Sequence, residues 1–202
     1  MNLIEKLKEA HKRMEEAESA LAKDIWNEGL RLKFSEAELD LLDIERSVAA
    51  LENRDYAIDW KIGENWRRGG HGALVFSDQF TCVLVFKENC DYVIININNY
   101  KSFKLSEIND EVIVGHPLYG RGIKAYGTYM VINSSWISEL RATNSIHPQF
   151  DPEHWAAQKH YMLCFKDCIF EAITAAQIEW ARISSREEVL SVALEKLRDQ
   201  MR

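Results

Sequence analysis

The sequence of 202 residues lacks the features that mark membrane-spanning and disordered chains. No apolar run in it approaches the roughly 18 residues that a spanning helix requires. The N-terminal segment is charged from Glu5 onward, which excludes the apolar core of a secretory signal. There are only 3 prolines and no Gly/Ser-rich stretch of linker length. These absences predict a globular protein of the cytoplasm with no membrane segment.

The sequence also lacks the short motifs that identify common catalytic centres. It contains no HExxH, no GxSxG, and no phosphate-loop or dinucleotide-binding pattern. Its 4 cysteines have no partner pair at zinc-ligand spacing, and they lie in or beside apolar segments where a thiol behaves as a small buried hydrophobe. We therefore predict buried reduced thiols, no metal site and no cofactor. Zinc or serine-hydrolase chemistry would have to be assembled from distant positions.

The sequence has fewer basic than acidic residues. The chain has 25 Lys and Arg against 32 Asp and Glu, a net charge of −7, and most of the acidic excess lies in residues 1–55. An acidic surface repels the phosphate backbone of nucleic acids at long range. We therefore expect no nucleic-acid partner.

The N-terminal part of the chain has the apolar periodicity of helices. Spacings of four and three residues alternate along Leu3, Leu7, Ala10, Met14, Ala17 and Leu21. This pattern predicts a helix that continues to about Leu30, followed by a second helix from Ser35, whose spacing to Glu38 is that of a capping box. Residues 1–53 are thus predicted to form a helical hairpin arm. The segment 3–30 is a candidate surface for a homo-oligomer.

From residue 54 the sequence changes to short segments rich in β-branched and aromatic residues. The predicted strands are 57–62, 72–76, 81–86, 92–98, 111–114, 125–133, 159–165 and 168–174. Several breaks between them are too short for crossover helices, so neighbouring strands are predicted to pair antiparallel. Residues 54–202 are then an α+β domain: a central, largely antiparallel sheet of about six to seven strands, an inserted short helical region and a C-terminal helix. We expect arm and domain to form one continuous structural unit.

Two segments combine glycine with positive charge. Residues 115–127, GHPLYGRGIKAYG, contain 4 of the 9 glycines and no carboxylate, and residues 66–72 read WRRGGHG. Their cationic and aromatic side chains are Trp66, Arg67, Arg68, His71, Tyr119, Arg121 and Lys124. Glycine lets successive backbone amides approach an anion, and arginine matches phosphate or carboxylate oxygens. We predict that the two loops converge on an anion. The alternative is that they are turns with solvated cations.

A histidine and a glutamate are predicted to meet across a hairpin. With Lys166 and Asp167 as its two-residue turn, the strands 159–165 and 168–174 place His160 and Glu171 on one face as diagonal neighbours. A carboxylate orients a histidine and raises its basicity, as acid–base catalysis requires. His116 is a further candidate from the first glycine-rich loop. A purely structural contact is the alternative for this pair.

Three functional hypotheses follow. The first is a cytosolic binding protein that accepts an anionic small molecule, or an anionic group of a protein partner, between the two glycine-rich loops. The second is an enzyme that acts on a small phosphorylated or carboxylated substrate, with His160, His116 or Glu171 as acid or base. The third is a structural or regulatory interaction protein that binds through its acidic helical arm.

Overall fold

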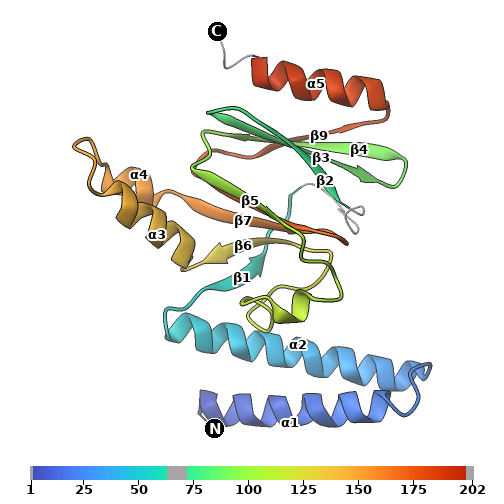
Figure 1. Ribbon diagram of the computed structural model, residues 1–202. Helices are drawn as coiled ribbons and strands as arrows, with labels where there is room; N and C mark the ends of the chain where they lie inside the picture. Colours follow the sequence, from blue (N-terminus) through green and yellow to red (C-terminus); the bar gives the residue numbers. More distant parts are fainter. Residues whose placement is uncertain (1, 63–71, 199–202) are drawn as a thin grey trace.

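The structure, a computed structural model, describes residues 2–62 and 72–198. It confirms the α+β class, the N-terminal helical hairpin and the C-terminal helix. Within the described residues the strands form two antiparallel sheets, of five and four strands, where the sequence predicted a single sheet. The hairpin lies at one end of the molecule and helix α5 (Arg186–Arg198) at the other, with the sheets between them (Figure 1).

The hairpin consists of α1 (Leu3–Leu21) and α2 (Glu28–Leu51), which lie side by side (Figure 1). A capping box between Asn2 and Glu5 begins α1. The predicted inner boundaries were wrong, because α1 ends nine residues before Leu30 and α2 begins before Ser35. The side chain of Asn27 accepts a hydrogen bond from the amide of Leu30 at 3.1 Å and begins α2 there.

The first sheet has the strand order β1-β6-β7-β8-β5. Its strands are β1 (Tyr56–Asp59), β5 (Ser102–Ser106), β6 (Thr128–Ile132), β7 (Lys159–Cys164) and β8 (Ile169–Thr174). The second sheet has the order β2-β3-β4-β9. It contains β2 (Ala73–Ser77), β3 (Thr81–Glu88), β4 (Asp91–Asn98) and β9 (Glu179–Ile183). The segment 111–114 is not a strand: it runs through a turn into the short 3-10 helix η1 (Ile113–Gly115).

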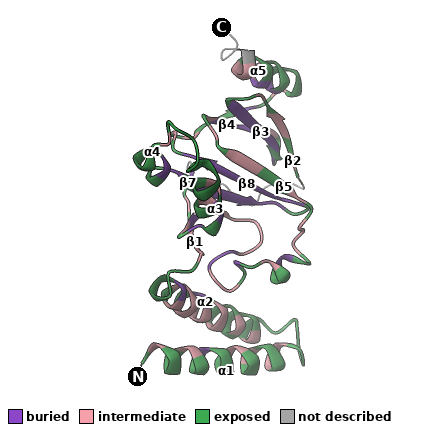
Figure 2. Cartoon of the chain, turned by 60° about the vertical axis from the view of Figure 1, so that its left-hand side comes forward, coloured by how far each residue is buried: buried purple, intermediate pink, exposed green. Residues whose placement is uncertain are grey.

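The two sheets face each other across a shared apolar interior. Leu84 of β3 and Ile95 of β4 belong to the same buried cluster as Leu163 of β7 and Phe170 of β8. Figure 2 shows that buried residues are concentrated on these central strands. Helix α5 covers the outer face of the second sheet through Val189 and neighbouring residues.

The outer face of the first sheet is covered in part by the connection between β5 and β6. Ile113, Leu118 and Ile123 of this connection pack with Tyr129 of β6 and Met162 of β7. Two short helices, α3 (Ser135–Asn144) and α4 (Pro152–Ala156), flank the ends of β6 and β7 (Figure 1). The outer face of this sheet therefore has a loop at one end and helices at the other.

The glycine-rich segment 115–127 packs against helix α2 and strand β1. Gly120 has φ +80°, and a Cβ there would lie 2.4 Å from Glu45 Oε2. Gly122 has φ +121°, and its Cβ would lie 2.1 Å from the carbonyl oxygen of Ala57. Positive φ angles strain any residue other than glycine, and at Gly122 a side chain would also overlap rigid backbone. The close approach of this connection to α2 and to β1 therefore depends on these two glycines.

Three of the cysteines agree with the predicted burial. Cys82, Cys164 and Cys168 are buried, and burial raises the pKa of the Cys82 and Cys164 thiols to about 12. Cys90 contradicts the prediction, because it is exposed in the tight turn between β3 and β4. The preceding residue, Asn89, has φ +56°, as this turn requires.

Candidate functional site

The β7–β8 hairpin has the register predicted from its two-residue turn. Cys164 pairs with Ile169, and Met162 pairs with Glu171. His160 and Glu171 are therefore diagonal neighbours on the outer face of the first sheet. His160 Nε2 and Glu171 Oε2 lie 2.9 Å apart, and the two side chains are only 5% and 13% exposed.

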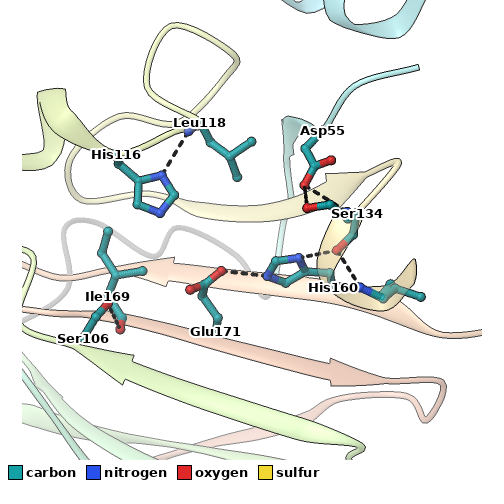
Figure 3. A network of polar contacts seen from close by, with 10 residues as sticks. Asp55, Ser106, His116, Leu118, Ser134, His160, Ile169 and Glu171 are labelled. Carbon is teal, nitrogen blue, oxygen red and sulfur yellow. Dashed lines mark hydrogen bonds and ion pairs between the residues drawn. The ribbon is translucent and has the colours of Figure 1, made fainter. Parts of the chain in front are cut away.

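The second ring nitrogen of His160 contacts Ser134, which the sequence analysis did not single out. His160 Nδ1 lies 2.9 Å from Ser134 Oγ (Figure 3). Asn133, with φ +54°, turns the chain out of β6, and Ser134 then caps α3 by accepting a hydrogen bond from the amide of Ile137. When Ser134 Oγ donates to His160 Nδ1, the opposite ring nitrogen donates through Nε2–H to the Glu171 carboxylate, so both contacts are satisfied at once.

His116 approaches the same carboxylate from the glycine-rich connection. Its Nδ1 accepts a hydrogen bond from the amide of Leu118 at 3.1 Å, and its ring points toward the first sheet (Figure 3). Burial is the main cause that lowers the pKa of His116, and the nearby Glu171 carboxylate opposes it. The three residues proposed for acid–base chemistry thus come together on one face of the sheet.

Opposing effects act on the Glu171 carboxyl. Desolvation, the largest single cause, raises its pKa, while the hydrogen bond and charge of His160 lower it, as do the charges of Lys104 and His116. Together these positive partners outweigh burial and leave the pKa of Glu171 below its usual value. Glu171 is therefore a carboxylate at neutral pH. Lys104 also lies over the Trp136 ring, with Nζ 3.7 Å from the centroid.

Ser134 lies at the wall of a cleft of about 660 Å³ beside β6, α3 and α4. Its polar and charged lining includes Asp55, Ser134, Ser135, Arg141, Gln158 and Lys159. Asp55 Oδ2 accepts hydrogen bonds from the backbone amide and the hydroxyl of Ser135, at 3.0 and 2.7 Å (Figure 3 shows Asp55 beside Ser134). Arg141 and Lys159 are exposed and form no ion pair with any acid among residues 2–62 and 72–198.

Gln158 places an unsatisfied acceptor at this cleft. The residue is 7% exposed, and its Oε1 is buried without a hydrogen-bond partner in the described part of the chain. Its Nε2 donates to the carbonyl oxygen of His154 at 3.0 Å, which fixes the orientation of the amide. A buried acceptor without a donor costs about 1–3 kcal/mol, so a ligand that donates to it gains affinity.

The cations of the glycine-rich segment 115–127 have partners within the chain. Lys124 Nζ lies 2.9 Å from Glu38 Oε2 on α2, and the Arg121 guanidinium donates to the carbonyl oxygens of Pro117 and Asp55. Tyr119 is partly exposed, and desolvation is the main cause that raises its pKa. The other half of the predicted anion site, Trp66, Arg67, Arg68 and His71, lies outside the described residues. The convergence of the two loops stays a prediction.

The described part of the chain contains neither a cluster of potential metal ligands nor a helix suited to span a membrane. Within it, no group of three or more His, Cys, Asp or Glu side chains is placed to hold a metal ion. Nor does any helix there have both the length and the apolar character needed to cross a bilayer.

Comparisons of the chain with protein-family models, with curated proteins and with solved structures gave no match. The assignment of a function therefore rests on the geometry of the cleft and of the polar chain behind it.

Proposed function

We propose that the protein binds a small anionic ligand in the cytoplasm, in the cleft beside β6, α3 and α4. The observation that supports this most strongly is the charge balance of the cleft. Its carboxylate, Asp55, is already hydrogen-bonded to Ser135, while Arg141 and Lys159 have no acidic partner within the described residues. The cytoplasmic location agrees with 4 cysteines that form no disulfide.

The chemistry of the cleft narrows the ligand class. A guanidinium and an ammonium group suit phosphate or carboxylate oxygens. Gln158 Oε1 has no hydrogen-bond partner within the described residues, so a ligand with a hydroxyl or N–H donor would satisfy it. A volume of about 660 Å³ lies in the usual range for small-molecule sites. The best fit is a small phosphorylated or carboxylated molecule that also has a hydroxyl or amino group.

A calorimetric titration with three probes tests this proposal. Glycerol 3-phosphate offers both an anion and hydroxyl donors, methyl phosphate offers only the anion, and glycerol offers only the donors. We expect glycerol 3-phosphate to bind on the order of tenfold tighter than methyl phosphate, because one satisfied buried acceptor is worth about 1.4 kcal/mol. Glycerol alone should not bind measurably.

Variants connect the binding to the cleft. Arg141→Ala and Lys159→Ala should each weaken the binding of glycerol 3-phosphate by about tenfold. Gln158→Leu should remove only the difference in affinity between glycerol 3-phosphate and methyl phosphate. Lys87→Ala, which removes an exposed lysine from β3 of the second sheet, is the matched control. The proposal is wrong if neither phosphate binds, or if the two cleft variants behave like the control.

The same titration distinguishes the cleft from the site predicted between the glycine-rich loops. Loss of phosphate binding in Arg67→Ala, with normal binding in Arg141→Ala, would assign the anion to the loops. Arg121→Ala is less informative, because Arg121 also donates hydrogen bonds to two backbone carbonyl oxygens.

The hydrogen-bonded chain from Ser134 through His160 to Glu171 favours a second function, hydrolysis of a small anionic ester. The same three groups, a hydroxyl, an imidazole and a carboxylate, follow one another in serine hydrolases. Here the hydroxyl contacts Nδ1 and the carboxylate contacts Nε2, whereas in those enzymes the hydroxyl contacts Nε2 and the carboxylate contacts Nδ1. Ser134 Oγ would attack the ester carbonyl carbon as His160 Nδ1 takes its proton, and Glu171 would stabilise the imidazolium. The leaving alcohol would then receive that proton, and water would hydrolyse the acyl group from Ser134 by the reverse sequence.

Active-site labelling tests this second function. A fluorophosphonate probe should modify Ser134, as mapped by peptide mass spectrometry, and Glu171→Gln should slow the labelling by at least about tenfold. The neighbouring hydroxyl variant Ser135→Ala should label normally. Absence of a Ser134 adduct in the folded wild-type protein would remove the hydrolase proposal and leave the binding proposal untouched.

A further inference from the structure

Strand β4 changes from apolar to polar along the face that helix α5 covers. Ile94 packs in the apolar cluster under α5, but the next residues on that face are Asn96 and Asn98. Asn96 is only 5% exposed and pairs in register with Glu179 of β9. A buried amide at this position requires a polar partner.

The amide group of Asn96 is satisfied on one side only. Its Nδ2 donates to Asn98 Oδ1 and to Glu179 Oε2, both at 3.3 Å. Because both partners are acceptors, a flipped amide would place oxygen against oxygen, so the orientation is fixed. Asn96 Oδ1 is then buried with no hydrogen-bond partner among residues 2–62 and 72–198.

Asn96 lines a pocket of about 290 Å³ between the second sheet and α5. The apolar part of the lining comes from Ile94, Trp180, Ala181 and Val192, and its polar end is formed by Asn96, Glu179 and Lys196. Lys196 Nζ lies 3.5 Å from Glu179 Oε2. The pocket lies on the outer face of the second sheet, whereas the lining of the cleft comes from β6, α3 and α4 beside the first sheet.

We propose that this pocket binds a small apolar amine. Its ammonium group would donate to Asn96 Oδ1 and to the Glu179 carboxylate, and its apolar chain would lie against Ile94, Ala181 and Val192. An ammonium group supplies both the donor that Asn96 lacks and a positive charge that complements Glu179. Lys196 at the same end allows the amine to carry a carboxylate as well, so free apolar α-amino acids belong to the class. The volume suits a chain of leucine size.

Three probes of the same shape test the proposal: isopentylamine, leucine and 4-methylpentanoate. They share one branched apolar chain and present an ammonium group, both charged groups, or a carboxylate alone. Binding is followed by ¹H–¹⁵N NMR at the Asn96 side-chain amide and at the amides of Ala181 and Val192. We expect isopentylamine and leucine to shift these signals in a saturable way, and 4-methylpentanoate to leave them unchanged.

Two variants complete the test. The Glu179 side chain is 58% exposed, and Glu179→Gln keeps its shape and an acceptor oxygen. This variant should weaken the binding of isopentylamine by about tenfold, which corresponds to the loss of one charge-assisted hydrogen bond. Glu195→Gln, an exposed acid on α5 outside the pocket, should bind normally. The proposal is overturned if 4-methylpentanoate binds as well as the amine, if no probe shifts the pocket signals, or if Glu179→Gln binds like the wild type.

Discussion

Glu171 reaches His160 across the β7–β8 hairpin although its register partner is Met162, two residues further along β7. The contact is diagonal, and it leaves the other ring nitrogen of His160 directed at Ser134 (Figure 3). One imidazole thus joins three segments of the first sheet: the β6–α3 turn, β7 and β8. The proposed hydrolase function depends on this connection, because Ser134 lines the cleft and His160 lies behind it.

Removal of the Glu171 carboxylate is expected to destabilise the protein. Glu171→Ala leaves His160 Nε2 buried without a partner, and we expect the free energy of unfolding to fall by about 1–3 kcal/mol. Glu171→Gln restores an acceptor and should recover part of this loss. Urea denaturation measures the change, and Glu107→Ala, at an exposed acid, is the control. An unchanged midpoint in Glu171→Ala would show that the contact does not form in solution.

Acidification should reduce stability in two steps. The pKa of His116 is lowered from 6.5 in the folded state, mainly by burial, so the unfolded chain takes up its proton first as the pH falls below about 6.5. The pKa of Glu171 in the folded state is lowered from 4.5. The contribution of Glu171 to the free energy of unfolding is therefore complete above about pH 4.5, and it is lost as the pH falls through the lower pKa of the folded state. Urea unfolding over about pH 8 to pH 3.5 measures both steps.

Two variants separate these steps. His116→Asn keeps an acceptor for the Leu118 amide and should abolish only the step at higher pH. Glu171→Gln should abolish the step at lower pH and enlarge the step at higher pH, because the Glu171 carboxylate opposes the lowering of the His116 pKa. A stability that rises on acidification from pH 7 to pH 5 would contradict the assignment to His116.

Local rules were sufficient to predict the hairpin and its His160–Glu171 contact, since a two-residue turn fixes the register and the register fixes the faces. They failed for β5 and β9: SFKLS has polar or charged residues at three of its five positions, and four of the five residues of EWARI are exposed. Ser134 had no local signal of function either. It is 26 residues from His160 in the chain, and its role as the cap of α3 accounts for a serine at that position.

One fast-reacting thiol is expected in the folded protein. Cys90 is exposed, whereas burial raises the pKa of the Cys82 and Cys164 thiols to about 12 and also raises that of Cys168. A thiolate is the reactive species, so a disulfide reagent such as Ellman's should titrate one group quickly and the others only on unfolding. Cys90→Ser should remove the fast phase. A second fast thiol in the folded variant would mean that the core opens on the timescale of the reaction.

The packing of the connection 115–127 on strand β1 is tested by a pair of glycine substitutions. In Gly122→Ala the new Cβ would lie 2.1 Å from the Ala57 carbonyl oxygen at a backbone φ of +121°, so strain and overlap act together. We expect a loss of about 2–4 kcal/mol in the free energy of unfolding. Gly115→Ala, in the same connection, meets nothing within 4 Å and should change stability by less than about 0.5 kcal/mol. If the two variants unfold at the same denaturant concentration, the connection does not approach β1 in solution in the way described.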